Sequence, residues 1–159
     1  MNPTRIDLTP DHRSKLCSLL NQRLADIIDL TQQARQAHWN VKGPNFIALH
    51  HLFDEIYAYL GAQTDDIAER IVALGGNAEG RVQAVAKATS LPHYPDGLHG
   101  GRSHLDALAS SVAVFGKAVR EGIDQTDKLG DADSADLLTG ISREIDKYLW
   151  FLEAHLQDH

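Results

Sequence analysis

The chain has 159 residues, which predicts one domain large enough to bury a substantial hydrophobic core. Its apolar fraction of 43% and charged fraction of 23% are ordinary for a globular protein, and its net charge is −7. The acidic balance argues against nucleic-acid binding by the body of the protein, because phosphate contacts need clustered Lys and Arg side chains. The same negative charge would attract cations.

Cysteine usage and hydropathy also exclude several classes of protein. Cys17 is the only cysteine, so a disulfide framework is excluded and a reducing cytoplasm is the simplest setting. We expect Cys17 to pack on a helix. The N-terminus contains no apolar stretch typical of a signal peptide, and no apolar run approaches the ~18 residues of a membrane span.

The first helix is expected to follow a short tail, residues 1–8. Thr9-Pro10-Asp11 is typical of a helix start, with Thr as N-cap, Pro at the first helical position and an acid in the first turn. Apolar residues then recur every three or four positions as far as about Trp39, which predicts one buried stripe. Gly43-Pro44 predicts a short turn, so the next helix should return antiparallel.

The remaining helices complete an all-α fold in one domain, residues 1–159. A second helix is predicted over 46–74 and ends at Gly75-Gly76. The connection 77–100 is long for neighbouring helices, and 81–87 could form a short helix on it. Further helices are predicted over 103–125 and from Asp131 or Asp133 to Leu156. Four long helices with one crossover indicate a ferritin-like four-helix bundle.

Five side chains of metal-ligand type lie just before the Gly43-Pro44 turn or on the predicted second helix. They are His38, His50, Asp54, Asp65 and Glu69. At ~100° per residue, the last four lie within roughly 100° of one another on the second helix, and therefore share a face. His50 and Asp65 are nevertheless roughly 22 Å apart along the axis, at ~1.5 Å rise per residue. One helix cannot bring both to a single metal ion.

A twofold axis would remove this difficulty. Positions 50 and 69 have the same midpoint as positions 54 and 65, near residue 59.5. Two copies of the helix, packed antiparallel, would place His50 opposite Glu69 of the neighbour and Asp54 opposite its Asp65. Small residues occupy the crossing point, at Ala58, Gly61 and Ala62. Because a twofold interface is self-complementary, we predict two equivalent intersubunit metal sites.

The same residues carry a family resemblance. His38-Trp-Asn-Val-Lys-Gly-Pro-Asn-Phe, His50-x3-Asp54 and Asp65-x2-Ala-Glu69-Arg resemble the signature of the Dps family, the mini-ferritins. The resemblance implies a ferroxidase in a hollow shell of twelve subunits, which oxidises Fe(II) with hydrogen peroxide, or O2, and stores ferric mineral. It also implies that His38, His50 and Asp54 come from one subunit and the other two ligands from its neighbour, with room for two irons per site.

The resemblance has further implications that the sequence supports unequally. Asp131 and Asp136 resemble acids that line iron-entry pores, although acids at a helix start also suit the helix dipole. Several family members bind DNA through a Lys-rich tail, and a nucleoid-associated DNA-condensing protein is the alternative function. Here the tail is short and mixed in charge and the C-terminus is not basic, so DNA binding through a tail is not expected.

Other residues near the ligands have open roles. We expect Trp39 in the core or at an interface, where it could also donate an electron, and Tyr57 carries a weaker version of that expectation. His51 is a candidate extra ligand. A single-subunit di-iron oxidase is disfavoured, because such bundles use Glu-x-x-His pairs and this chain has none.

Overall fold

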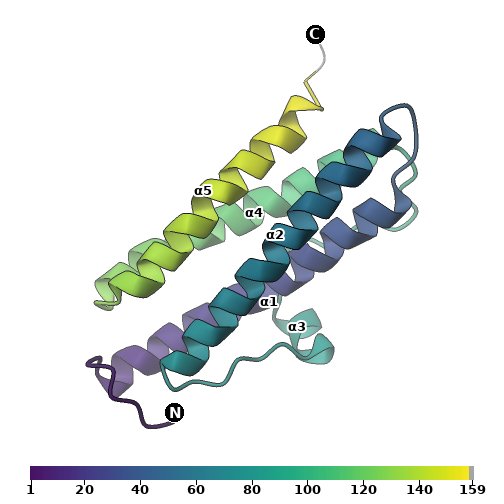
Figure 1. Cartoon of the computed structure of the whole chain (residues 1–159). Coiled ribbons are helices and arrows are strands. Elements are labelled where there is room, and N and C mark those ends of the chain that lie inside the picture. The colour runs from purple at the N-terminus through teal and green to yellow at the C-terminus, as the bar shows by residue number, and fades with distance from the viewer. Residues whose placement is uncertain (158–159) are drawn as a thin grey trace.

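The computed structural model describes residues 1–157 and contains five α-helices (Figure 1). They are α1 (Pro10–Asn40), α2 (Phe46–Ala73), α3 (Val82–Ala88), α4 (Gly101–Lys128) and α5 (Ala132–Ala154). The predicted bundle of four long helices, with a short helix on its crossover, is confirmed. Asp158 and His159, which end the chain, lie outside the described residues.

The four long helices form two antiparallel hairpins. α1 pairs with α2 through the turn around Gly43, and α4 pairs with α5 through Gly130 (Figure 1). The end of α2 and the start of α4 lie at opposite ends of the bundle, so the crossover runs its length and places α3 against α1. No helix among the described residues meets the length and hydropathy required to span a membrane.

Local signals set the ends of the first hairpin as predicted. The Thr9 hydroxyl accepts a hydrogen bond from the His12 amide at 3.2 Å, and Pro10 occupies the first turn. α2 ends in a Schellman motif, in which the Gly76 amide donates to Ile71 O and the Gly75 amide to Val72 O. Gly75 has φ +87°, a conformation that favours glycine.

The third long helix is longer at both ends than its sequence predicts. It covers Gly101–Lys128, whereas the apolar pattern predicts 103–125. Gly100 serves as the N-cap, a position that tolerates glycine, so the Gly100-Gly101 pair precedes and begins the helix without interrupting it. The apolar stripe is an incomplete guide here because the terminal turns are largely exposed.

A continuous core is formed by the apolar stripes of all four long helices. Its largest fully buried side chains are Phe53, Phe115, Leu16, Leu20, Leu24, Ile27, Leu30, Leu49, Ile56, Leu60, Ile67 and Ile71. Cys17 is also buried, as expected, and its thiol faces Ile71 O. The core side of α2 leaves its neighbouring face, which carries the candidate ligands, free of the core.

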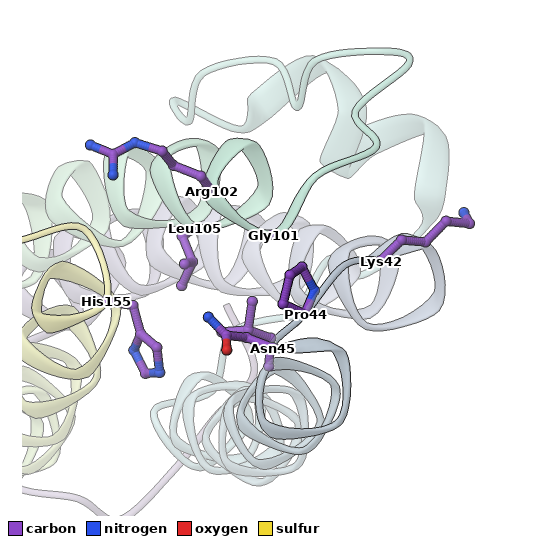
Figure 2. A pocket seen from close by; sticks show the side chains of 8 residues that line it. Lys42, Pro44, Asn45, Gly101, Arg102, Leu105 and His155 are labelled. Carbon is purple, nitrogen blue, oxygen red and sulfur yellow. The ribbon is translucent and has the colours of Figure 1, made fainter. Parts of the chain in front are cut away.

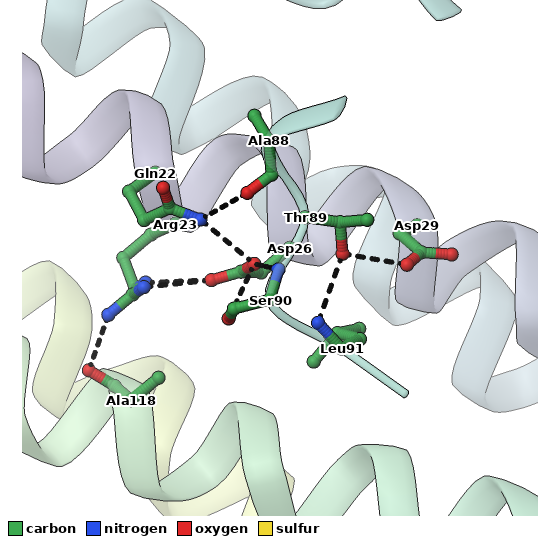
Figure 3. Close-up of polar contacts among 9 residues, drawn as sticks. All are labelled: Gln22, Arg23, Asp26, Asp29, Ala88, Thr89, Ser90, Leu91 and Ala118. Atoms are coloured by element: carbon green, nitrogen blue, oxygen red, sulfur yellow. Dashed lines mark hydrogen bonds and ion pairs between the residues drawn. The ribbon is translucent and has the colours of Figure 1, made fainter. Parts of the chain in front are cut away.

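The crossover is attached to α1 by a buried polar network, shown in Figure 3. We define the α1–crossover network as Gln22, Arg23, Asp26 and Ser90. The fully buried Asp26 carboxylate accepts hydrogen bonds from both Ser90 N (2.7 Å) and Ser90 Oγ (3.0 Å). It also accepts from Gln22 and ion-pairs with Arg23, which donates to Ala118 O on α4. One carboxylate therefore joins α1, the crossover and, through Arg23, α4.

The N-terminal segment is held against the hairpin. Asn2 N donates to Gly75 O at 2.7 Å, and the buried Arg13 guanidinium donates to Asn2 O and to Leu74 O. Ile6 and Leu8 pack against the core. The tail is thus docked at the end of α2.

Candidate metal centre

The turn between α1 and α2 brings two histidines face to face. Gly43, with φ +114°, lets the chain reverse, and Phe46 N donates to Gly43 O. The last turn of α1 carries His38 and the second turn of α2 carries His50. Their imidazole rings stack with centroids 3.7 Å apart and planes inclined by 21°.

Both histidine rings are oriented by backbone carbonyls that face their Nδ1 atoms. His38 Nδ1 lies 2.8 Å from His50 O, and His50 Nδ1 lies 2.9 Å from His38 O. Since a carbonyl oxygen only accepts, each Nδ1 carries the hydrogen and each Nε2 of the neutral ring has a free lone pair. A carbonyl bound to one ring nitrogen is the usual means of orienting a histidine whose other nitrogen binds a metal. The reciprocal pair therefore presents two ordered nitrogen donors.

Asp54 joins the histidines on the next turn of α2. It lies four residues after His50, so the two side chains share a face. Asp54 Oδ1 is 4.0 Å from His38 Nδ1 and accepts an ion-pairing hydrogen bond of 2.6 Å from Arg35. The structure therefore brings together His38, His50 and Asp54 from one subunit.

The remaining two predicted ligands lie apart from this cluster. Asp65 and Glu69 are exposed on the second half of α2, and neither makes a hydrogen bond or ion pair with the described residues. Across residues 1–157, no group of three or more His, Cys, Asp or Glu side chains is arranged to hold a metal ion within one subunit. The intersubunit site remains a prediction, and a single subunit does not complete it.

The α2 face between the two groups has the shape that the twofold model requires. Ala58, Gly61 and Ala62 are exposed, and a Cβ added to Gly61 would meet nothing within 4 Å. Exposed apolar side chains lie near the two ends of the helix, where Ile47 is 60% exposed and Val72 56% exposed. This face is flat and apolar at its centre, and the subunit's own core does not use it.

Three neighbours of the candidate ligands have different surroundings. Trp39 is 64% exposed, so it does not belong to the core of the subunit and an interface role stays a prediction. Tyr57 is half-buried and its ring lies 4.2 Å from the Arg35 guanidinium carbon. His51 is exposed, with its ring 5.9 Å from that of His50. Among the described residues, no hydrogen bond or ion pair joins any of these three side chains to the histidine pair.

The two acids predicted for an entry pore differ in burial and in their contacts. Asp131 is only 3% exposed, caps α5 by accepting from Ser134 N, and forms an ion pair of 2.6 Å with Arg70. Asp136 is exposed. The cap and the ion pair account for Asp131 without a pore, and the pore role of both residues remains a prediction.

A cavity of about 260 Å³ lies at the end of the bundle near the start of α4 (Figure 2). It is lined by Lys42, Pro44, Asn45, Leu49, Gly101, Arg102, Leu105 and His155. These residues include no carboxylate and at least two cationic side chains. The cavity therefore does not suit a cation, and the candidate metal centre lies outside it.

Arg35 is the residue of this region that the sequence reasoning missed. It lies one helical turn before His38, and residues three apart on a helix are neighbours on its surface. That spacing could have indicated a cation beside the ligands. The sequence does not show that the arginine reaches across to Asp54 on another helix.

Comparison with known proteins decides the family. A model described as a ferritin-like domain matches residues 17–159. The DNA protection during starvation protein of Agrobacterium fabrum is 45% identical over 98% of this chain and 96% of its own length. The chain belongs to the Dps family of ferritin-like proteins. The resemblance seen in the sequence is thereby confirmed.

Solved Dps structures match the fold closely. Mycobacterium smegmatis Dps superposes with a TM-score of 0.94 at 31% identity, covering 99% of this chain and 95% of that one. Dps from Microbacterium arborescens in a high iron form gives a TM-score of 0.88 at 35% identity, covering 94% and 97%. Vibrio cholerae Dps, described as a member of a superfamily of ferritin-like diiron-carboxylate proteins, gives 0.91 at 29% identity, covering 99% and 98%. The ferritin-like bundle predicted from the helix pattern is thus confirmed.

Proposed function

We propose that this Dps protein is a ferroxidase and an iron-storage mini-ferritin. It binds Fe(II) at sites shared by two subunits, oxidises it with hydrogen peroxide or O2, and stores the ferric product in a hollow assembly of twelve subunits in the cytoplasm. The observation that carries this proposal is the reciprocal His38–His50 pair, in which each Nδ1 faces a carbonyl and each Nε2 is left available, with the Asp54 carboxylate 4.0 Å from the His38 ring nitrogen Nδ1. The high iron form of the Microbacterium arborescens relative supports iron as the metal.

The proposed ligands suit this substrate. Imidazole and carboxylate groups together suit Fe(II), and a site with few protein ligands leaves positions open for an oxidant. His38 and His50 supply nitrogen, Asp54 and the partner subunit's Glu69 supply the main carboxylates, and the partner's Asp65 supplies a second-site or hydrogen-bonding carboxylate. Two Fe(II) ions in one site would deliver two electrons to peroxide, so that water forms without release of hydroxyl radical.

The twofold face of α2 explains why the site should require assembly. Asp65 and Glu69 are too far along the helix to reach the histidine pair of their own subunit. The exposed Ala58, Gly61 and Ala62 permit close approach of a second α2. Protection from oxidative damage would follow, because the reaction consumes peroxide and Fe(II) together.

Anaerobic loading with Fe(II), followed by addition of peroxide, tests this function. We expect ferric absorbance to appear with about one peroxide consumed per two Fe(II), as electron balance in a two-metal site requires. His50→Ala should slow the step by about 100-fold. Replacing a residue that only orients a metal ligand costs 10–100-fold in activity, and replacing the ligand itself should cost at least as much. His93→Ala, which replaces an exposed histidine on the crossover, is the matched control. Equal rates in His50→Ala and wild type would refute the site.

The alternative function, DNA condensation, is disfavoured by the docked tail. The N-terminal segment is tied down through Asn2 and carries mixed charge, and the chain is acidic overall. A gel-shift assay at low and moderate salt distinguishes the two functions. We expect no retardation of DNA, whereas salt-sensitive retardation would support the alternative, a nucleoid-associated DNA-condensing function.

A further inference from the structure

The Asp54 carboxylate is not free in the metal-free subunit. Arg35 Nη1 lies 2.6 Å from Asp54 Oδ1, and their side chains are 28% and 51% exposed. The same oxygen atom lies 4.0 Å from His38 Nδ1. A cationic side chain thus already occupies the oxygen that faces the histidine pair.

Aromatic rings hold the guanidinium in this position. The Arg35 guanidinium carbon lies 4.2 Å from the Tyr57 ring centroid and 5.6 Å from that of Trp39. A planar guanidinium stacks on aromatic faces and is weakly hydrated, whereas a lysine ammonium is a strongly hydrated point charge. Arg35 therefore has contacts that remain available to it when the carboxylate is taken by another cation.

We propose that Arg35 is a built-in counter-cation for Asp54, which Fe(II) must displace, and that it sets the metal affinity of the site. The inference rests on the proposed function and deepens it. In the metal-free protein the guanidinium neutralises the carboxylate. When Fe(II) binds, Asp54 turns to the metal and Arg35 stays on the rings of Tyr57 and Trp39. Arg35 is a positioning residue, because it acts on the metal through Asp54.

Assembly gives this counter-cation a second purpose. In the twofold arrangement, Asp54 faces the partner subunit's Asp65. Two carboxylates brought together without a cation repel each other. Arg35 supplies a positive charge at this position, so the shell is stable before it meets iron. Metal binding then replaces one positive charge by two.

Removal of Arg35 should therefore lower the stability of the metal-free shell and raise its affinity for a divalent metal. The metal-free shell loses its counter-cation and becomes less stable. A divalent metal loses a competitor and a repelling charge, and should bind at least roughly tenfold more tightly at low salt, as Coulomb's law gives for a unit charge ~5 Å from a divalent ion with the dielectric constant of bulk water. Since the stabilisation by a ligand grows with the logarithm of its concentration divided by Kd, the metal should raise the melting temperature of the variant more than that of wild type.

The test uses assembled shells and Zn(II), a divalent probe that undergoes no redox chemistry. Titration calorimetry gives Kd and scanning calorimetry gives Tm, with and without Zn(II), for wild type, Arg35→Gln and Arg35→Lys. Arg120→Gln is the matched control, because Arg120 makes a similar exposed ion pair of 2.7 Å with Asp146 on α4 and α5. We expect tighter Zn(II) binding and a larger Tm increase in Arg35→Gln alone, with both differences shrinking at high salt. Arg35→Lys should stay near wild type in affinity.

Asp54→Asn, measured in the same way, separates failure of this inference from failure of the proposed function. If Asp54→Asn binds Zn(II) as wild type does, the site itself is wrong. If Asp54→Asn loses binding while Arg35→Gln binds no more tightly than wild type, Arg35 is not a competitor and only this inference fails. Weaker binding by Arg35→Gln, with an unchanged circular dichroism spectrum, would also overturn it.

Discussion

The α1–crossover network and the candidate ligands use the same kinds of side chain in opposite ways. Asp26 is fully buried, and donors from its own subunit surround its carboxylate. His38 and His50 are hydrogen-bonded only through Nδ1, which leaves Nε2 of each available. Asp65 and Glu69 are exposed and form no hydrogen bond or ion pair with a described residue of the subunit. Polar groups that the fold satisfies hold it together, whereas those that it leaves open are the ones available for chemistry.

The largest expected effect comes from closing the open face of α2. Gly61→Arg should leave the subunit folded, because a side chain there meets nothing within the subunit, and should block the approach of a second α2. We expect loss of the large assembly by size-exclusion chromatography and loss of peroxide-driven Fe(II) oxidation.

Gly140→Arg is the matched substitution for the subunit's own fold, since Gly140 is also a helical glycine with open space beside it. Both variants should keep their helical circular dichroism signal. An intact, active shell formed by Gly61→Arg would show that the α2 face is not the interface.

The next effect is on stability and concerns the α1–crossover network. Asp26→Ala would leave Arg23 without its carboxylate and the Ser90 amide without its acceptor. We expect a loss of about 3 kcal/mol in the free energy of unfolding, typical of a buried pair that loses one partner. Chemical denaturation measures it. Fe(II) oxidation at a temperature where the variant is folded should be unchanged; a strong loss of activity there would contradict the separation of the two regions.

A smaller effect should divide the two predicted pore acids. Asp131→Asn should destabilise the protein by about 2 kcal/mol, because the buried Asp131 carboxylate accepts hydrogen bonds from Arg70 and Ser134. Asp136→Asn should leave stability nearly unchanged and slow iron uptake a few-fold, if the exposed acid guides cations. Stopped-flow uptake and denaturation curves, measured on both variants, check this. Equal uptake in Asp136→Asn and wild type would exclude a pore role for Asp136.

The smallest effect concerns a buried histidine outside the metal centre. His104 is 1% exposed, Tyr94 Oη lies 2.7 Å from its Nδ1, and burial lowers the pKa of its imidazole from 6.5. The unfolded chain therefore binds a proton at a pH where the folded chain does not. Stability should be complete above about pH 6.5 and fall as pH drops from that value through the lower folded pKa.

His104→Phe should remove part of this decline, measured as the difference between the two proteins in unfolding free energy against pH. An identical pH dependence in both proteins would show that His104 makes no contribution. Because His104 is buried outside the candidate metal centre, this change should leave the affinity for Zn(II) unaltered.

The sequence predicted the architecture well because its signals are local and periodic. Thr9-Pro10 begins the first helix and Gly75-Gly76 ends the second, each through hydrogen bonds between near neighbours. The apolar stripes could be predicted from the helical period alone, because apolar residues recur every three or four positions. The ends of α4 were missed by two or three residues, because exposed terminal turns carry little of that period.

The site was predictable in part, for a different reason. His38, His50 and Asp54 could be grouped from their spacing and from one short turn. The long-range contacts of Asp26, Arg35 and Asp131 could not be predicted, because these partners lie 19 to 64 residues away in the sequence. Composition alone does not separate a buried acid from an exposed one.

A complementation measurement tests most directly the central claim, that two subunits complete each site. His50→Ala and Glu69→Gln each remove a ligand from every site in a shell built of one variant. In shells co-assembled from equal amounts of both, half of the twofold pairs are mixed and each mixed pair contains one intact site. We predict recovery of about a quarter of the wild-type rate of peroxide-driven Fe(II) oxidation. If the mixed shells are no more active than the single variants, each site lies within one subunit and the claim is wrong.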